Sequence, residues 1–144
     1  MKTVTAIHID PINKTITEIT IPASVARIER NPLRCETAEA VTLASDVDAW
    51  VDQDALSKDW DAMGFSILMG THTLAGPVVI TGSDEKGRII ELPPDITVEL
   101  VEQLTTFADP KTVRVPGPRE WHFNEKGKRV VKLLGPEWLT YENH

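Results

Sequence analysis

The stretch "GPVVITGSDEKGRIIELPPD", residues Gly76–Asp95, is the clearest structural unit of the sequence. Its two β-branched runs, "PVVIT" and "RIIEL", are typical of strands, and "GSDEKG" between them has the composition of a tight turn. Gly82 and Gly87 have no Cβ and can take the positive φ angles that such turns favour. The stretch therefore predicts a β-hairpin.

The same stretch also has two glycines at the spacing of a phosphate-binding loop. A Walker loop continues with Lys and then Ser or Thr, whereas Arg88 and Ile89 follow here. A helix should come next so that its N-terminus faces the phosphates, but a strand-like run and two prolines follow. Asp84 and Glu85 would also place negative charge inside the anion site. We therefore interpret the stretch as a turn.

A helical pattern follows this hairpin. The run "PPDITVELVEQLTTF" starts with Pro94 and Asp95, which are typical of a helix N-terminus, and Asp109 with Pro110 ends the pattern. We expect one main helix over residues 95–107. Its apolar stripe consists of Ile96, Leu100, Leu104 and Phe107.

Two further hairpins are predicted nearer the chain ends. The β-branched runs Thr3–Ile9 and Thr15–Ile21 are separated by the turn-forming "DPINK". Near the other end, "NEKGKRVVKL" (Asn124–Leu133) repeats the turn, cation and β-branched pair of "DEKGRIIEL" (Asp84–Leu92). Similar hairpin chemistry explains this likeness.

The segment between residues 46 and 63 fits two interpretations. As a helix, it places Val47, Trp50 and Val51 on one stripe. As a strand and turn, "AWV" is extended and "DQDA" reverses the chain. We favour a strand over Asp48–Val51 and helical character over Leu56–Met63, with the continuous helix as the alternative.

Length and patterning together predict one small domain. A chain of 144 residues can bury about two-thirds of its unfolded surface around a single core. The expected fold class is α+β: an antiparallel sheet built from β-hairpins, with the main helix packed on it. The domain spans residues 1–144, and residues 108–144 form a C-terminal hairpin extension.

Composition argues against several classes of protein. The sequence contains no apolar run long enough to span a bilayer, and its start lacks the apolar core of a secretory signal. Cys35 is the sole cysteine, which excludes an internal disulfide and fits a reducing cytoplasm. The net charge of −7 opposes non-specific binding to nucleic acid.

Acidic residues concentrate between Glu36 and Asp61, where eight carboxylates and one lysine give a net charge of −7. An EF-hand loop starting at Asp52 would need glycine where Ser57 stands and glutamate where Met63 stands, so no such loop is predicted. We interpret the cluster as a solvated acidic face that attracts a basic partner, with an irregular carboxylate metal site as the alternative. Its candidate residues are Asp46, Asp48, Asp52 and Asp54.

The histidines and the cysteine show no metal-site spacing. His8 alternates within a predicted strand and is interpreted as structural, whereas His72 lies in the loop-like "MGTHTLAG" and is a candidate ligand contact. Cys35 with His72 or His122 would form a nucleophile and base only if the fold brought them together. We therefore predict no catalytic residue, no metal and no cofactor.

The stretch "GPREWHF" is the best candidate contact surface near the C-terminus. An indole ring beside cations suits a nucleotide base and its phosphate, and tryptophan and arginine also dominate protein interfaces. The candidate binding residues are Arg114, Arg119, Trp121 and His122, together with His72.

Three pieces of the chain resemble a family of small domains of unknown function encoded mainly in bacteriophage and prophage genomes. They are "IHIDPINKTITEITI", "DAWVDQDALSK" and "AGPVVITGSDEKGRIIELP" with its following helix. The resemblance covers Thr3 to Phe107 in patches, and Ala55 stands where the family has a glycine. It implies a phage-encoded accessory protein in the host bacterial cytoplasm, and it carries no catalytic residues over.

From these patterns we expect a protein that binds stoichiometrically and is not an enzyme. The leading hypothesis is inhibition of a host defence or metabolic protein through the acidic face or the Arg119–Trp121 region. One alternative is a small-molecule binder that sequesters a signalling nucleotide, in a homo-oligomer. A second alternative is a hydrolase without a recognisable motif.

Overall fold

The computed structural model describes residues 2–108, 114–116, 119–123, 129–133 and 138–140, with side chains over residues 2–108. Its strands are β1 (Thr3–Asp10), β2 (Thr15–Pro22), β3 (Ala38–Ala44), β4 (Val47–Asp52), β5 (Phe65–Leu68), β6 (His72–Ala75), β7 (Val78–Ser83), β8 (Ile89–Ile90), β9 (Thr105–Ala108), β10 (Arg114–Pro116), β11 (Arg119–Phe123), β12 (Arg129–Leu133) and β13 (Trp138–Thr140). Its helices are α1 (Val25–Arg30), η1 (Ala55–Ser57, a 3-10 helix), α2 (Trp60–Met63) and α3 (Val98–Leu104). The fold class is α+β, as predicted.

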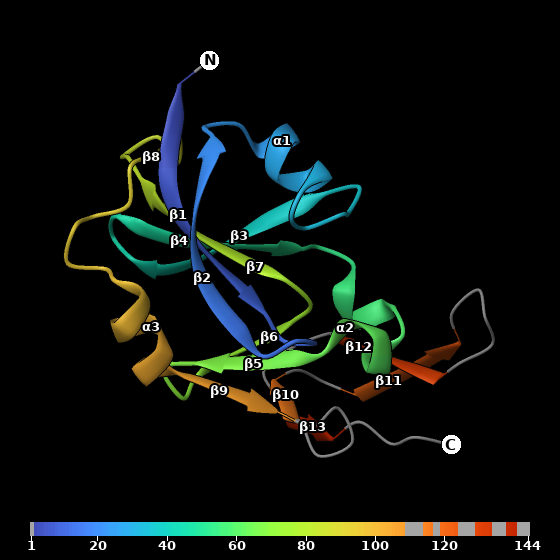
Figure 1. The fold of residues 1–144 in the computed structure, drawn as a ribbon. Helices are drawn as coiled ribbons and strands as arrows, with labels where there is room; N and C mark the ends of the chain where they lie inside the picture. Colours follow the sequence, from blue (N-terminus) through green and yellow to red (C-terminus); the bar gives the residue numbers. More distant parts are fainter. Residues whose placement is uncertain (1, 109–113, 117–118, 124–128, 134–137, 141–144) are drawn as a thin grey trace.

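The main sheet is antiparallel, with the strand order β2-β1-β7-β4-β3 and with β8 paired to the end of β7 (Figure 1). The N-terminal hairpin pairs Thr3 with Pro22 and Asp10 with Thr15. Asp10 caps the turn, because its Oδ1 accepts hydrogen bonds from the N–H groups of Ile12 and Asn13 at 3.0 and 3.1 Å. The N-terminal hairpin and the β7–β8 hairpin are both confirmed.

The two glycines of the β7–β8 hairpin serve different purposes. Gly87 has a φ of 76°, as the turn chemistry predicts. Gly82 has no positive φ; it is needed because a Cβ there would lie 2.2 Å from the carbonyl oxygen of Glu91. The Glu91 carboxylate in turn accepts from the N–H of Thr5 at 3.0 and 3.1 Å. The chain after β8 therefore crosses close over β7 and is tied to β1.

The main sheet is covered on both faces by different elements (Figure 1). On one face, Trp50 and Val79 pack with Ile28 of α1. The indole N–H of Trp50 donates to the Thr81 hydroxyl at 3.0 Å within this layer. On the opposite face, apolar side chains of the strands pack against α3 and against a second sheet with the order β6-β5-β9; they include Ile7, Ile9, Val78 and Ile80.

The segment between residues 46 and 63 combines a strand with short helices. Val47–Asp52 is extended, and η1 and α2 follow it, so the favoured prediction is confirmed and the continuous helix is wrong. Trp60 of α2 packs edge-to-face on Phe65 of β5, with ring centroids 4.9 Å apart. These aromatic rings join the helical turn to the second sheet.

The main helix is shorter than predicted. Thr97, and not Asp95, caps α3, and its hydroxyl accepts from the N–H of Leu100 at 3.1 Å. The helix ends at Leu104 because the next four residues form β9 and pair with β5. Phe107 therefore lies on a strand, and the predicted helical stripe through it is wrong.

Two predictions near the second sheet and the C-terminus have different outcomes. His72 begins strand β6, where it pairs with Leu68, so the predicted loop around it is wrong. Near the C-terminus, β11 and β12 pair antiparallel and so form a hairpin, and β10 pairs with β13. None of the helices in the described part of the chain combines the length and apolar character needed to cross a bilayer.

Candidate functional site

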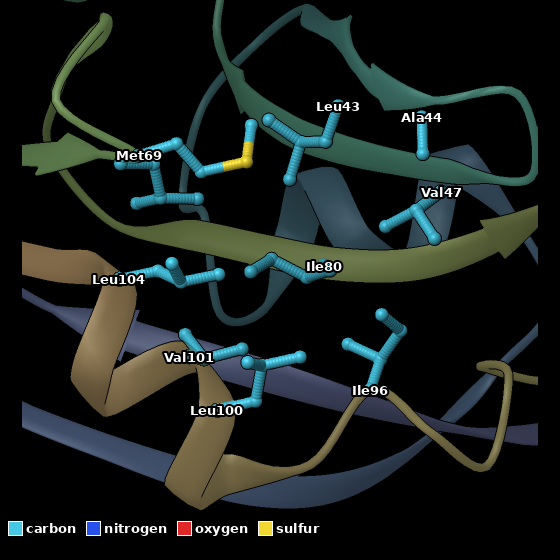
Figure 2. Close-up of a pocket in the computed structure, with 10 residues that line it drawn as sticks. Leu43, Ala44, Val47, Met69, Ile80, Ile96, Leu100, Val101 and Leu104 are labelled. Atoms are coloured by element: carbon cyan, nitrogen blue, oxygen red, sulfur yellow. The ribbon is translucent and has the colours of Figure 1, made fainter.

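An apolar pocket with a volume of about 90 Å³ lies between α3 and the face of the main sheet (Figure 2). Strands β3, β4, β5 and β7, the turn after β5, and α3 with the residues before it form its wall. Every lining side chain is apolar: Leu43, Ala44, Val47, Leu68, Met69, Ile80, Ile96, Leu100, Val101 and Leu104. Such a lining suits an aliphatic group and offers no hydrogen-bonding side chain to a polar one.

The pocket has a buried floor and an exposed rim. Val47, Ile80 and Val101 of the floor are buried, and Ile80 is only 1% exposed. At the rim, Met69 and Leu104 are 40% and 39% exposed, which is high for large apolar side chains. Met69 and Leu104 thus place exposed apolar surface beside an open apolar pocket, which makes this pocket the candidate binding site among the described residues.

Backbone geometry places the two rim residues. Met69 and Gly70 have φ angles of 54° and 68°, so the chain turns sharply between β5 and β6. The N–H of Met69 donates to the carbonyl oxygen of Leu104 at 2.8 Å. This bond satisfies a carbonyl at the end of α3 that has no partner within the helix, and it fixes one end of the pocket.

A β-bulge shapes the opposite wall. The register of β3 against β4 shifts between Thr42 and Ala44, so that Thr42 pairs with Asp48 and Ala44 pairs with Val47. The extra residue in β3 turns both Leu43 and Ala44 toward the pocket, as Figure 2 shows. Bulges commonly redirect side chains beside binding sites in this way.

The predicted acidic face is only partly exposed. Asp46 and Asp54 are exposed, but Asp48 and Asp52 are 7% and 4% exposed, so the prediction of one solvated face of four carboxylates is wrong. The two buried carboxylates alternate along β4 with Val47, whose side chain faces the pocket. They lie on the α1 side of the sheet. There Asp52 pairs with the Lys58 ammonium group and accepts from the N–H of Asp54 at 2.9 Å.

Cys35 and the histidines with described side chains form no catalytic group. Cys35 packs with the cluster on the α1 side of the main sheet, whereas His72 lies in the second sheet on the other side. Burial, followed by the negative charges of Asp52 and Glu29, raises the pKa of the Cys35 thiol to about 11. The Cys35 thiol is therefore protonated at neutral pH and lies apart from His72, so the fold does not bring this pair together.

His8 is held neutral by its surroundings. Burial lowers the pKa of its imidazole, and the nearby Asp10 carboxylate opposes that shift more weakly. Its Nε2 atom is buried and has no hydrogen-bond partner in the described part of the chain. The side chain lies within β1 between Thr17 and Val79 of the neighbouring strands, which fits the structural role predicted for it.

The candidate residues near the C-terminus are placed only by their backbones. Arg114 lies on β10, and Arg119, Trp121 and His122 lie on β11, where Trp121 pairs with Val131. Their side chains lie outside the described residues, and the nucleotide site proposed for them stays a prediction. His72, grouped with them in the prediction, is half-buried. Within residues 2–108, no cluster of three or more His, Cys, Asp or Glu could hold a metal ion.

Sequence patterns did not reveal the pocket. Leu104 belongs to the predicted apolar stripe of the helix, which is also what a core residue would show, and Met69 falls in a segment predicted to be a loop.

Comparison with protein-family models, with curated proteins and with solved structures gives no significant match to this chain. The resemblance to phage-encoded domains therefore also stays a prediction.

Proposed function

We propose that the protein acts stoichiometrically by binding a protein partner, one of whose aliphatic side chains enters the pocket beside α3. The observation that supports this function is the exposed apolar rim, Met69 and Leu104, at the mouth of a cavity with a wholly apolar lining. Exposed apolar surface of this kind costs solubility in a free protein, and burial in a partner interface removes that cost.

The size of the pocket sets the size of the group it takes. A cavity of about 150 Å³ holds benzene, so 90 Å³ corresponds to about three or four carbon atoms. The branched end of a leucine, isoleucine or valine side chain has this size. Burial of such a group contributes about 1.5–3 kcal/mol, so the pocket supplies an anchor and the surrounding surface supplies the rest of the affinity.

The resemblance of residues 3–107 to phage-encoded domains supports a bacterial host as the source of the partner. In this proposal the protein occupies the surface of a host defence or metabolic protein in the host cytoplasm. Inhibition then follows from occupancy, and the proposal assigns no cofactor and no catalytic step to the protein.

The first experiment tests whether the pocket is open in solution. Xenon is a neutral apolar atom that enters cavities of this kind, and methyl NMR would report its position. We expect shifts at Val47, Ile80 and Leu104. The Ala44→Phe variant should fill the pocket from the Val47 end and abolish these shifts, whereas Ala40→Phe is a matched control at an exposed position of the same strand outside the lining. Absence of shifts in the unmodified protein would contradict the proposal.

The second experiment tests function with the same variants. A host protein recovered in equimolar amount with the unmodified protein and with Ala40→Phe, but lost with Ala44→Phe, would support binding through the pocket. Equal recovery with both variants would show that the partner binds elsewhere.

A further inference from the structure

The chain segments that build the pocket share one property: they carry acidic residues but no lysine or arginine. All ten lining residues fall in three runs without lysine or arginine, residues 36–57, 59–85 and 89–108. Exposed carboxylates directly adjoin lining residues in sequence in the first and third runs: Asp46, Asp95, Glu99 and Glu102.

Two of these carboxylates lie at the same end of the pocket. Asp46 occupies the turn between the lining residues Ala44 and Val47, and Asp95 directly precedes the lining residue Ile96. Figure 2 shows Val47 and Ile96 facing each other at the end away from Met69 and Leu104. Asp46 and Asp95 are exposed and therefore place two carboxylates at the border of this end, one on each side of the pocket.

The cations between the three runs lie outside the pocket lining, although the β7–β8 turn adjoins the Asp46 turn, where the N–H of Ser83 donates to the carbonyl oxygen of Asp46 at 2.9 Å. Lys58 pairs with Asp52 on the α1 side of the sheet, and Arg88 pairs with Asp84 at the β7–β8 turn at 2.7 Å. Lys86 lies in that same turn. Each cation thus belongs to a segment outside the pocket lining.

An apolar pocket within an anionic surface selects its partner by charge. We infer that the partner segment is a basic peptide in which an aliphatic side chain is flanked by lysine or arginine; this inference rests on the proposed function. The aliphatic group fills the pocket, and the flanking cations meet the carboxylates at its border. The same field repels acidic peptides, fatty-acid carboxylates and anionic lipid surfaces, and so provides specificity as well as attraction.

Three short synthetic peptides test this inference: leucine flanked by lysines, leucine flanked by glutamates, and alanine flanked by lysines. NMR titration of the whole chain would give each Kd at low and at physiological salt. We expect the lysine–leucine peptide to bind at least about tenfold more tightly than the other two and to weaken as salt screens the charges. The shifts should centre on Met69, Leu104 and Val47.

A charge-reversed variant tests whether Asp46 and Asp95 cause the preference for the lysine peptide. The double variant Asp46→Lys/Asp95→Lys should lose the preference for lysine over glutamate. A matched control, Asp54→Lys/Asp61→Lys, changes the net charge equally at exposed positions around η1 and α2, away from α3 (Figure 1), and should keep the preference.

The outcomes separate this inference from the proposed function. Equal binding of the lysine and glutamate peptides, or of the leucine and alanine peptides, would overturn the inference. If xenon nevertheless enters the pocket and Ala44→Phe excludes it, the pocket remains a binding site for a partner of other chemistry. If neither xenon nor any peptide binds, both the inference and the proposed function are wrong.

Discussion

The N–H of Met69 donates to the carbonyl oxygen of Leu104 at 2.8 Å, so a backbone bond ties the turn after β5 to the end of α3. The side chains of these two residues form the exposed rim of the pocket. Since a backbone bond holds them together, changes to either side chain should leave the rim geometry intact.

Truncation of the rim should separate binding from stability. Leu104→Ser removes an apolar side chain that is already partly exposed, so we expect the free energy of unfolding to fall by about 1 kcal/mol or less. Xenon binding and partner binding should weaken clearly. Ile80→Ala on the buried floor should instead cost about 2–5 kcal/mol. Chemical denaturation of both variants checks the contrast, and equal destabilisation would argue that Leu104 is a core residue.

Gly82→Ala should be strongly destabilising. A Cβ at this position would meet the backbone carbonyl of Glu91 at 2.2 Å, and backbone atoms cannot move aside cheaply. We expect a loss of about 3 kcal/mol in the free energy of unfolding. At Gly87 a Cβ meets nothing within 4 Å, so Gly87→Ala should cost only about 1–2 kcal/mol, for its positive φ. Comparison of their denaturation midpoints tests this order.

Thr81→Val should show how much the buried hydrogen bond from Trp50 contributes to the free energy of unfolding. The change keeps the shape of the side chain but leaves the indole N–H without its acceptor, at a cost of about 1–3 kcal/mol. In the double variant Trp50→Phe/Thr81→Val no donor is left unsatisfied, so the two losses should not add. Strict additivity in this cycle would show that the bond contributes nothing to stability.

His8 should make stability depend on pH below about 6.5. Its folded pKa is lowered from 6.5, so the unfolded chain takes up a proton first as the pH falls, and unfolding becomes easier. His8→Val should remove this dependence. Carboxylates such as Glu91, with an ordinary pKa of 4.5 lowered by its bonds to Thr5, should still destabilise the variant as they protonate at lower pH. Thermal melts at several pH values test this, and parallel curves for the two proteins would refute it.

Cys35 should react slowly with thiol reagents in the folded protein. A rise in its pKa from 9.0 to about 11 lowers the thiolate fraction at pH 8 about 100-fold. Iodoacetamide labelling should therefore be clearly slower than in the denatured chain, by at least about tenfold because the greater nucleophilicity of a high-pKa thiolate offsets part of the effect. Equal labelling rates would show that the thiol is neither buried nor shifted in pKa.

Local patterns predicted the hairpins but not the end of the main helix. The β-branched runs and turn residues of β1–β2 and β7–β8 lie close together in sequence, so their pairing is visible there. Phe107 also fits a helical stripe with Leu100 and Leu104. Its position on β9 depends on β5, which pairs Ser66 with Phe107, and this contact between distant segments overrides the local preference.

The pocket and the burial of Asp48 and Asp52 could not be predicted from the sequence, because both depend on contacts between distant segments. Asp48 and Asp52 alternate with apolar residues, as on a strand with a solvated face. Burial of that face comes from the α1 segment, which packs through Ile28 and Leu33. The pocket is a space that α3 and the second sheet leave uncovered, so no single segment has a sequence pattern that indicates it.

The central place of β7 has a consequence for how the chain folds. The hairpins β1–β2 and β3–β4 contain only local contacts and can form early, on the microsecond scale typical of hairpins. Neither can join the other until β7, later in sequence than both, inserts between β1 and β4. Closure of these long loops should limit the folding rate. A nascent chain that ends before Val78 would thus contain the residues of both hairpins without the strand that joins them.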